Sequence, residues 1–456
     1  MPREIRLHDT LSGQLRTLSP REAGKVGIYA CGPTVYSRVH VGNARPFVVF
    51  SLLARFLAHC GLEPTLVINV TDVNDKIYDA ARSAGVASQE LADEMTSRYI
   101  EDTDRLGLGR PHHEPRASQA IDGIVALIAE LIDSGAAYPA GGDVYFRVSS
   151  FRDYGKLSNR AREDMVQGED DEERSGLKED PQDFALWKAQ KPGEDTSWPA
   201  PWGSGRPGWH IECSAMAEAI LGLDLDIHGG GLDLVFPHHE NEIAQTEAAR
   251  AAPLARIWMH NGMVRTDGEK MAKSVGNIFA LHSALDEYGR EALLMYFAGG
   301  HYRQPLVFSP DALADAGRAA ERVRELCRRL DPGGAAPPAL APFRERFFDR
   351  LAEDYNTAAA RAELFDWVAE ANRSLDRGER LGVGGFREML SMLGLEGLLD
   401  QLADVAGPDE ERLLAEREEA RSARDFAAAD ARRDELAARG WEVRDTPAGP
   451  QLVRVR

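Results

Sequence analysis

The chain has 456 residues, too many for one hydrophobic core, so we expect two to four domains. Its composition, 43% hydrophobic and 28% charged, is typical of a soluble globular protein. The start MPREIRLHDT is charged and lacks the apolar core of a secretory signal, so none is expected. No stretch approaches the roughly 20 apolar residues that span a bilayer, so we expect a cytoplasmic protein without a membrane partner. The net charge of −20 argues against holding nucleic acid through overall charge, though not against a shaped RNA on a local basic face. Four cysteines make no disulfide framework here, so free or metal-bound thiols are expected.

The first part of the chain reads as a βαβ unit. Residues 25–31 form a short β-rich run, and after a Gly/Pro loop residues 42–59 have the apolar spacing of a helix that Gly61 ends. Residues 65–70 read as a second strand. A strand, helix and strand in this order imply a parallel sheet.

The same order returns later in the chain. Residues 223–228 read as a strand, 237–251 as a helix and 256–264 as another strand. Two such halves, far apart in sequence, indicate one α/β sheet interrupted by an insertion over about 116–205. The acidic run 163–180 inside that insertion is expected to be a solvated loop.

Beyond about residue 306 the sequence is helical. Residues 309–330 and 343–376 are rich in Ala, Leu, Arg and Glu, with a linker by composition between them. Residues 407–440 predict two charged helices, the second beginning after Asp425 as its N-cap. Residues 441–455 predict a small hairpin, and such an appendix on an α/β enzyme usually recognises a partner.

A four-residue stretch, His40-Val41-Gly42-Asn43, lies where the first strand-exit loop enters a helix. Gly42 allows a ligand to approach the backbone, and the helix N-terminus offers unpaired N–H groups to phosphate. His40 and Asn43 add side-chain donors. The alternative is plain helix capping, since a match of four residues also arises by chance.

The stretch KMAKS, residues 270–274, follows a strand-like segment. Lys270 and Lys273 are mobile point charges suited to polyphosphate, with Ser274 beside the second. The alternative is a solvated surface loop.

The phrase PHHE occurs twice, and the second copy continues as PHHENE. There His238 and Glu242 are four residues apart on one predicted helix face, and His239 and Glu242 are three apart, so spacing does not choose between the histidines. With Cys31 and Cys213, either histidine and the carboxylate suit Zn²⁺. The alternative is buried cysteines and a hydrogen-bonded histidine, because neither cysteine has a CxxC partner.

The first copy, residues 111–114, has no such geometry. Pro115 disfavours helical backbone at Glu114, and the positions four beyond its histidines are Arg116 and Ala117. We therefore expect a loop-like boundary there.

Together these stretches resemble the class I aminoacyl-tRNA synthetases and, among them, the cysteinyl-tRNA synthetases. HVGN is similar to the first nucleotide signature, with one histidine replaced by Asn43, and KMAKS to the second, with Ala272 replacing a serine. Residues 29–47, 205–216 and 229–245 and the C-terminal DFAAADARRDEL and GWEVRDTP also look like this family. The resemblance covers essentially the whole chain.

The resemblance implies an α/β fold: a Rossmann-like parallel-sheet catalytic domain split by an insertion, then a helical bundle and a small C-terminal anticodon-binding domain. The segments expected are 1–115 and 206–255 for the two catalytic halves, 116–205 for the connective insertion, 256–308 for a stem-contact region with the KMAKS loop, 309–400 for the bundle, and 401–456 for anticodon recognition.

The implied reaction joins L-cysteine to tRNA(Cys) with ATP and Mg²⁺, by a monomer that holds one Zn²⁺. The implied site residues are His40, Asn43, Lys270 and Lys273 for catalysis, Gly42, Lys273 and Ser274 for the nucleotide, Thr71, Trp209 and Asp233 for the amino acid, and Cys31, Cys213, His238 and Glu242 for zinc. The resemblance thus selects His238 over His239, while Trp209 is otherwise read as a core aromatic.

Three rival interpretations differ in testable ways. A cysteine ligase of mycothiol biosynthesis resembles the same core but lacks the C-terminal module that residues 407–456 supply. A zinc-dependent binding or structural protein would carry HVGN and KMAKS by accident. A zinc hydrolase is disfavoured because four protein ligands leave no position for a water.

The arginines of the C-terminal module either contact tRNA or pair with neighbouring acids; they are Arg421, Arg424, Arg432 and Arg433.

Overall fold

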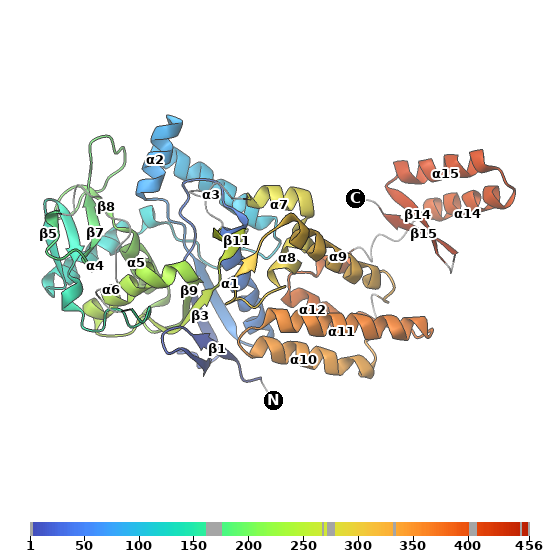
Figure 1. Ribbon diagram of the computed structural model, residues 1–456, viewed down its shortest axis with the longest axis horizontal. Helices are drawn as coiled ribbons and strands as arrows, with labels where there is room; N and C mark the ends of the chain where they lie inside the picture. The colour runs from blue at the N-terminus through green and yellow to red at the C-terminus, as the bar shows by residue number, and fades with distance from the viewer. Residues whose placement is uncertain are drawn as a thin grey trace.

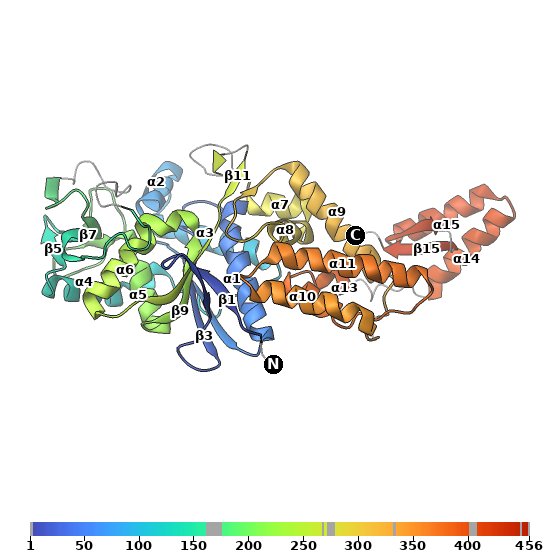
Figure 2. The same cartoon turned by 60° about the horizontal axis from the view of Figure 1, so that its bottom comes forward.

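The computed structural model describes residues 3–160, 176–266, 269–270, 279–331, 334–400, 408–446 and 449–454. Most of the predicted acidic loop and residues 271–274 of KMAKS lie outside these ranges. An α/β body lies at the centre, with the insertion at one end and a helical bundle and a small C-terminal unit towards the other (Figure 1). Figure 2 shows the same order from a second direction.

The central sheet has four parallel strands in the order β10-β9-β3-β4. They are β3 (Lys25–Ala30), β4 (Glu63–Ile68), β9 (Leu225–Gly231) and β10 (Ala255–Asn261). Ile28 of β3 pairs with Leu66 on one side and with Ile227, two hundred residues away in sequence order, on the other. The predicted α/β fold with a split parallel sheet is therefore confirmed.

Side chains that alternate along β3 build two different cores. Ile28 joins the cluster that contains the apolar face of α1 (Val41–His59), including Phe50 and Leu53. Tyr29 points to the other face, where it joins Met216 of α5 (Trp209–Leu221) in a separate cluster. The two-residue period of a strand thus places a helix on each face of the sheet.

Helix α1 is long and apolar enough by composition to cross a membrane, contrary to the expectation that no stretch of the chain would be. In the described residues it is the one helix with this property, and 72% of its most apolar window is buried inside the protein. Its apolarity is explained by its place between the sheet and the bundle (Figure 2).

Each outer strand of the sheet has a further segment beside it. A hairpin of β1 (Arg6–Asp9) and β2 (Gln14–Thr17) lies beside β10, where Thr10 N donates to Trp258 O at 2.8 Å. On the other side the first PHHE copy runs parallel to β4: Ile68 N donates to His113 O at 3.1 Å, and Val70 N to Pro115 O at 2.9 Å. The predicted boundary is thus an extended segment paired to the sheet.

Two helices precede the insertion, α2 (Asp75–Ala84) and α3 (Ser88–Asp104). The insertion packs one helix on an antiparallel sheet of order β5-β6-β7-β8 and has its own apolar cluster. Its elements are α4 (Ile121–Asp133), β5 (Ala137–Ala140), β6 (Asp143–Phe146), β7 (Phe184–Ala189) and β8 (Gly205–Pro207). Lys188 and Arg206 both pair with Asp75, which ties the insertion to α2.

Beyond β8, helix α5 returns the chain to the body. Gly208 lies so close to β7 that a Cβ there would be 2.0 Å from the carbonyl oxygen of Ala185. After β9, a kinked turn (Val235–His239), in which Phe236 has an extended backbone, leads into α6 (Glu240–Arg250). A small sheet then follows β10; its strands are β11 (Val264–Thr266), β12 (Glu269–Lys270) and β13 (Leu306–Val307).

The remaining helices form the bundle and the C-terminal unit. The bundle contains α7 (Leu281–Tyr288), α8 (Arg290–Phe297), α9 (Pro310–Cys327), α10 (Ala341–Ala352), α11 (Thr357–Asp376), α12 (Phe386–Met392) and α13 (Gly397–Asp400). The C-terminal unit contains α14 (Pro408–Ser422), α15 (Phe426–Ala438), β14 (Trp441–Thr446) and β15 (Gly449–Arg454). Its small core of Leu413, Leu436 and Trp441 is separate from that of the bundle. The predicted N-cap is confirmed, since Asp425 accepts from Ala428 N at 3.1 Å.

Candidate functional site

A cavity of about 410 Å³ opens where three strands of the central sheet end. Cys31 follows β3, Gly231 ends β9 and Asn261 ends β10, and all three line the cavity. The N-terminus of α1 forms another part of its wall. Ligands of open α/β sheets bind in this position, beyond the carboxyl ends of the strands.

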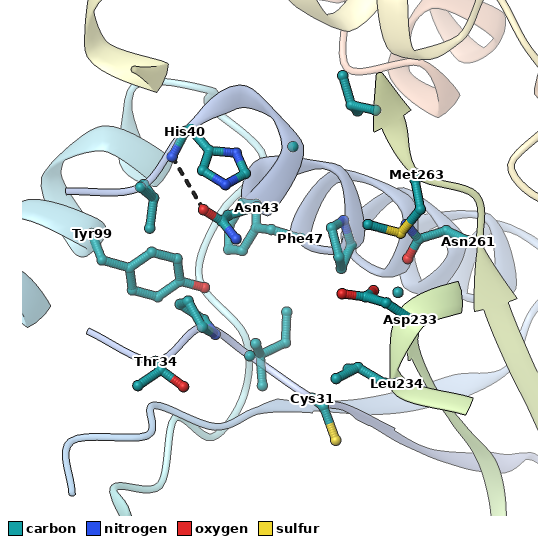
Figure 3. Close-up of a pocket in the computed structure, with 18 of the residues that line it drawn as sticks. Cys31, Thr34, His40, Asn43, Phe47, Tyr99, Asp233, Leu234, Asn261 and Met263 are labelled. Carbon is teal, nitrogen blue, oxygen red and sulfur yellow. Dashed lines mark hydrogen bonds between the residues drawn. The ribbon is translucent and has the colours of Figure 1, made fainter. Parts of the chain in front are cut away.

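The α1 end of the cavity carries the first predicted nucleotide motif. Figure 3 shows His40 and Asn43 on one side of the cavity and Asp233, Asn261 and Met263 on the opposite side. Asn43 Oδ1 accepts from the backbone N–H of His40 at 3.2 Å, so the motif also caps its helix. Capping and a phosphate-binding role are therefore compatible here.

A buried group of metal-ligating side chains lies at the Cys31 end. Ligand atoms of Cys31, His238, His239 and Glu242 all lie within 4.8 Å of one another. The Nε2 atom of His238 is 2.9 Å from Glu242 Oε1 and 3.5 Å from Cys31 Sγ. Cys213 of α5 borders this group, since it is buried in the same cluster as Cys31. Of the predicted zinc set, this group contains Cys31, which follows β3, His238, which precedes α6, and Glu242 of α6. Cys213 is not a member of the group, and His239 takes the fourth place.

Both histidines of the second PHHE face the cluster. The Nε2 atom of His239 is 3.3 Å from Cys31 Sγ and 3.9 Å from Glu242 Oε1. The Nδ1 atom of His238 is 3.0 Å from Nδ1 of His210, and Nδ1 of His239 is 2.7 Å from Nε2 of His260. A hydrogen bond at Nδ1 leaves Nε2 of each ring directed at the cluster, as is usual for metal-binding histidines.

Two residues of the predicted zinc set have pKa values that favour the deprotonated, metal-binding form, and two do not. Burial raises the pKa of the Cys31 thiol well above its ordinary value, and, against the effect of burial, Glu242 and Cys213 raise the pKa of His238 to about 10. The hydrogen bond with Cys31 lowers the pKa of the Cys213 thiol to about 6, against the effect of burial. Burial opposes ionisation of Glu242, but His228 and His238 hold the pKa of its carboxyl well below the ordinary value. A thiolate and a carboxylate close to imidazoles form a suitable donor set for Zn²⁺.

The residues predicted for the amino acid divide into two groups. Trp209 and Asp233 line the cavity, and the Trp209 ring stacks on His238 with centroids 4.3 Å apart. Thr71 is not among the described lining residues: its backbone N–H donates to Pro33 O at 3.1 Å and its hydroxyl accepts from Asn69 at 3.2 Å. Thr71 therefore holds the loop that follows Cys31.

The second nucleotide motif is described only in part. Lys270 lies in β12, paired with Arg265 of β11. Lys273 and Ser274 lie outside the described residues.

Sequence reasoning missed several residues of the site. His228 of β9 is fully buried, and its Nε2 lies 3.0 Å from Glu242 Oε2. Asn261 and Met263 form the wall opposite α1. The sequence around His228 predicts a strand, but it does not predict that the His228 side chain contacts the carboxylate of Glu242.

Two family models and several known proteins match this chain. Residues 17–318 match the family model of the class I (C) tRNA synthetase catalytic domain, and residues 405–454 match that of the cysteinyl-tRNA ligase anticodon binding domain. The cysteine–tRNA ligase of Halorhodospira halophila is 46% identical, over 99% of this chain and 100% of that protein. The chain belongs to the cysteine–tRNA ligase family. It is therefore a ligase of the aminoacyl-tRNA synthetase class.

A second relative supports membership of this family, and a solved structure supports the fold. The cysteine–tRNA ligase of Symbiobacterium thermophilum is 45% identical, over 99% of each chain. The methionyl-tRNA synthetase of Mycobacterium tuberculosis, solved with methionyl-adenylate, superposes with a TM-score of 0.61 at 16% identity, covering 89% of this chain and 96% of that one. That second likeness concerns the class I fold alone.

Proposed function

We propose that the protein activates L-cysteine with ATP and Mg²⁺ and then transfers the cysteine to the 3′-terminal adenosine of tRNA(Cys). In the first step the carboxylate of cysteine attacks the α-phosphorus of ATP and forms cysteinyl-adenylate and pyrophosphate. The observation that carries this proposal is that one cavity is lined at one end by Cys31, a member of the Cys/His/Glu cluster, and at the other by the N-terminus of α1. The names of the relatives support the same reaction.

We assign one zinc ion per chain to Cys31, Cys213, His238 and Glu242, with His239 as the alternative imidazole. A zinc ion held there would supply a coordination position that a thiolate fills far better than the neutral hydroxyl of serine. Shape alone discriminates poorly between two substrates that differ by sulfur and oxygen, so a chemical difference is needed.

Neighbouring histidines orient the proposed ligands. His210 lies against Nδ1 of His238, which directs the other ring nitrogen towards Glu242. His228 lies against the second carboxylate oxygen of Glu242. Outer contacts of this kind fix the orientation of metal ligands and are needed for high affinity.

The α1 end is assigned to ATP. Negative charge develops on the phosphate oxygens as the adenylate forms, and donors fixed in advance stabilise that charge. We assign this role to His40 and Asn43, with Lys270 and Lys273 from the KMAKS segment. Gly42 has no side chain, which allows close approach of the nucleotide to the backbone. A Cβ there would also be 2.9 Å from the His40 ring and would displace it.

Trp209 and Asp233 are assigned to the amino acid, since both line the cavity between its two ends. The Asp233 carboxylate suits the ammonium group of cysteine by charge. Thr71 is assigned an indirect role through the loop it holds.

Cysteine-dependent exchange of pyrophosphate into ATP tests the activation step. We expect Cys213→Ser and His238→Ala to raise the KM for cysteine far more than the KM for ATP, and to relax the rejection of serine. The matched variant His239→Ala distinguishes the two imidazoles. Unchanged affinity for cysteine in protein stripped of metal by a chelator would contradict the assignment.

Charging of tRNA(Cys), run beside an amino-sugar acceptor, tests the second step. We expect charging of the tRNA alone, in a cytoplasmic monomer, with residues 401–456 recognising the anticodon. Transfer only to the sugar would identify the mycothiol-type ligase instead.

A further inference from the structure

One buried cation on α1 is held by carbonyl groups. Arg45 is 1% exposed, and no carboxylate pairs with it in the described parts of the chain. Its two terminal nitrogens donate to five backbone carbonyls, those of Gly262 (2.6 Å), Met263 (3.2 Å), His301 (3.2 Å), Tyr302 (3.0 Å) and Gln304 (2.7 Å). Burial lowers the pKa of Arg45 to about 10, so the guanidinium stays charged at neutral pH.

The five carbonyls belong to two segments that meet at the guanidinium. Gly262 N donates to Tyr302 O at 2.8 Å, and a Cβ on Gly262 would lie 2.4 Å from Gln304 O. The first segment continues into β11 and the second into β13, and these strands pair with each other through Val264 and Leu306. The guanidinium is thus placed where both strands of this small sheet originate.

The first of these segments is also a wall of the cavity. Gly262, Met263 and Val264 line it. Met263 lies on the side opposite His40 and Asn43 (Figure 3). His40 is the N-cap of α1, Asn43 lies in its first turn, and Arg45 follows in the next turn of the same helix. One rigid helix therefore connects the two sides of the ATP end.

We propose that Arg45 is a positioning residue for ATP. Its guanidinium fixes the Gly262–Met263 wall at a set distance from His40 and Asn43, so the ATP end of the cavity is formed before the nucleotide arrives. The inference rests on the proposed function, in which ATP occupies that end. Arg45 has no contact with the cluster at Cys31, so the thiol end should not depend on it.

Arginine is required at this position because of the number of acceptors. The two terminal nitrogens of a guanidinium carry four N–H groups in a fixed plane and share them among the five carbonyls, whereas a lysine ammonium presents three N–H groups from one point. Arg45→Lys keeps the charge and leaves carbonyls of the wall unsatisfied. If Arg45 only stabilised the fold, Arg45→Lys would lower the thermal stability and leave the KM values for ATP and for cysteine of the folded protein unchanged.

The test compares Arg45→Lys with Arg55→Lys in the full-length protein. Arg55 lies on the same helix and also donates to carbonyls, of Ser391 at 3.0 Å and Leu108 at 3.2 Å, but these face the bundle. In cysteine-dependent exchange, R45K should raise the KM for ATP by about 10- to 100-fold and change the KM for cysteine by less than about twofold. R55K should leave both unchanged.

Two further measurements keep the inference separate from the proposed function. ATP titration by calorimetry, without cysteine, should show the same loss of affinity in R45K even if no exchange were found. Low millimolar guanidinium should lower the KM for ATP of Arg45→Ala, and methylammonium should not. If R45K does not fold, Gly262→Ala disturbs the same wall and should raise the KM for ATP.

The inference is overturned if R45K and wild type have equal ATP affinity. It is also overturned if the KM values for ATP and cysteine rise together, or if R55K matches R45K.

Discussion

At the residue scale, the segment that contacts Arg45 is held on its other side by an acid. Asp354 accepts from the Tyr302 hydroxyl at 2.9 Å, from Arg303 Nε at 2.8 Å and from His8 N at 2.9 Å. Burial alone would raise the pKa of Asp354, but the hydrogen bonds from His301, His8 and Arg303 lower it to about 2. Its ionised form therefore stabilises the join between the sheet and the bundle.

The pH dependence of this stabilisation follows from the sign of the shift. The pKa of Asp354 is lower in the folded protein than its unfolded value of about 3.9, so its ionised carboxylate stabilises the folded state, by about 2 kcal/mol. This stabilisation is fully present above pH of about 3.9 and is lost as the pH falls towards 2. We expect Asp354→Asn to have a lower urea midpoint than wild type at pH 7, with the difference shrinking below pH of about 4. A difference that stays constant down to pH 3 would show that the carboxylate charge is not its source.

The residue scale also shows where prediction from sequence ends. Cys31, His238 and Glu242 do lie close together, but only the family resemblance could predict this for Cys31, which is distant in sequence from the other two. His228 and Arg45 were missed. The partner of His228 is a carboxylate on a helix that is distant from β9 in sequence. The partners of Arg45 are backbone carbonyls, which carry no sequence signature.

At the element scale, α5 depends on a close backbone contact. The carbonyl of Ala185 and the N-cap Gly208 leave no room for a side chain, and the helix that starts there carries Cys213. We expect Gly208→Ala to displace α5 at a cost of about 1–3 kcal/mol and to reduce the zinc bound per folded chain. Thermal melting and metal analysis of the monomeric fraction measure both effects.

A matched glycine provides the control. Gly123 lies within α4, and nothing is within 4 Å of a Cβ built there. Gly123→Ala should leave bound zinc unchanged and stabilise the helix by about 0.5–1 kcal/mol. Full zinc content in G208A, with the melting temperature of wild type, would show that α5 tolerates the methyl group.

Elements with clear periodicity were predicted and those without it were not. Strands β3 and β4 and helix α1 were found because apolar runs and turn residues mark them. Helix α5 was missed because every residue from His210 to Ala217 is buried, which removes the polar face that reveals an amphipathic helix. No prediction covered α2 and α3.

At the scale of the whole molecule, the C-terminal unit has a core of its own. Its arginines pair largely within the unit: Arg432 with Glu416 at 2.8 Å and Arg433 with Asp430 at 3.2 Å. Exposed pairs of this kind contribute little to stability, so they can be exchanged for contacts to a polyanion.

A chain that ends at residue 400 separates the two steps of the reaction. Because the cavity and the C-terminal core share no residues, we expect unchanged cysteine-dependent exchange and a large loss of tRNA(Cys) charging. The full-length chain, assayed with the same tRNA preparation, is the control. Full charging by the shortened chain would remove the C-terminal unit from tRNA recognition.

The segments beside β4 and β10 have a consequence for the behaviour of the protein in solution. An open sheet ends in rows of free N–H and C=O groups, and these are templates for strands of other chains. The first PHHE copy occupies one such row, with Pro115 offering no donor of its own, and the N-terminal hairpin lies along the other. For another chain to add a strand to the sheet, the first PHHE copy or the N-terminal hairpin must first detach from it. Mutations that weaken the contact of either segment with the sheet should therefore promote fibrils before they affect catalysis.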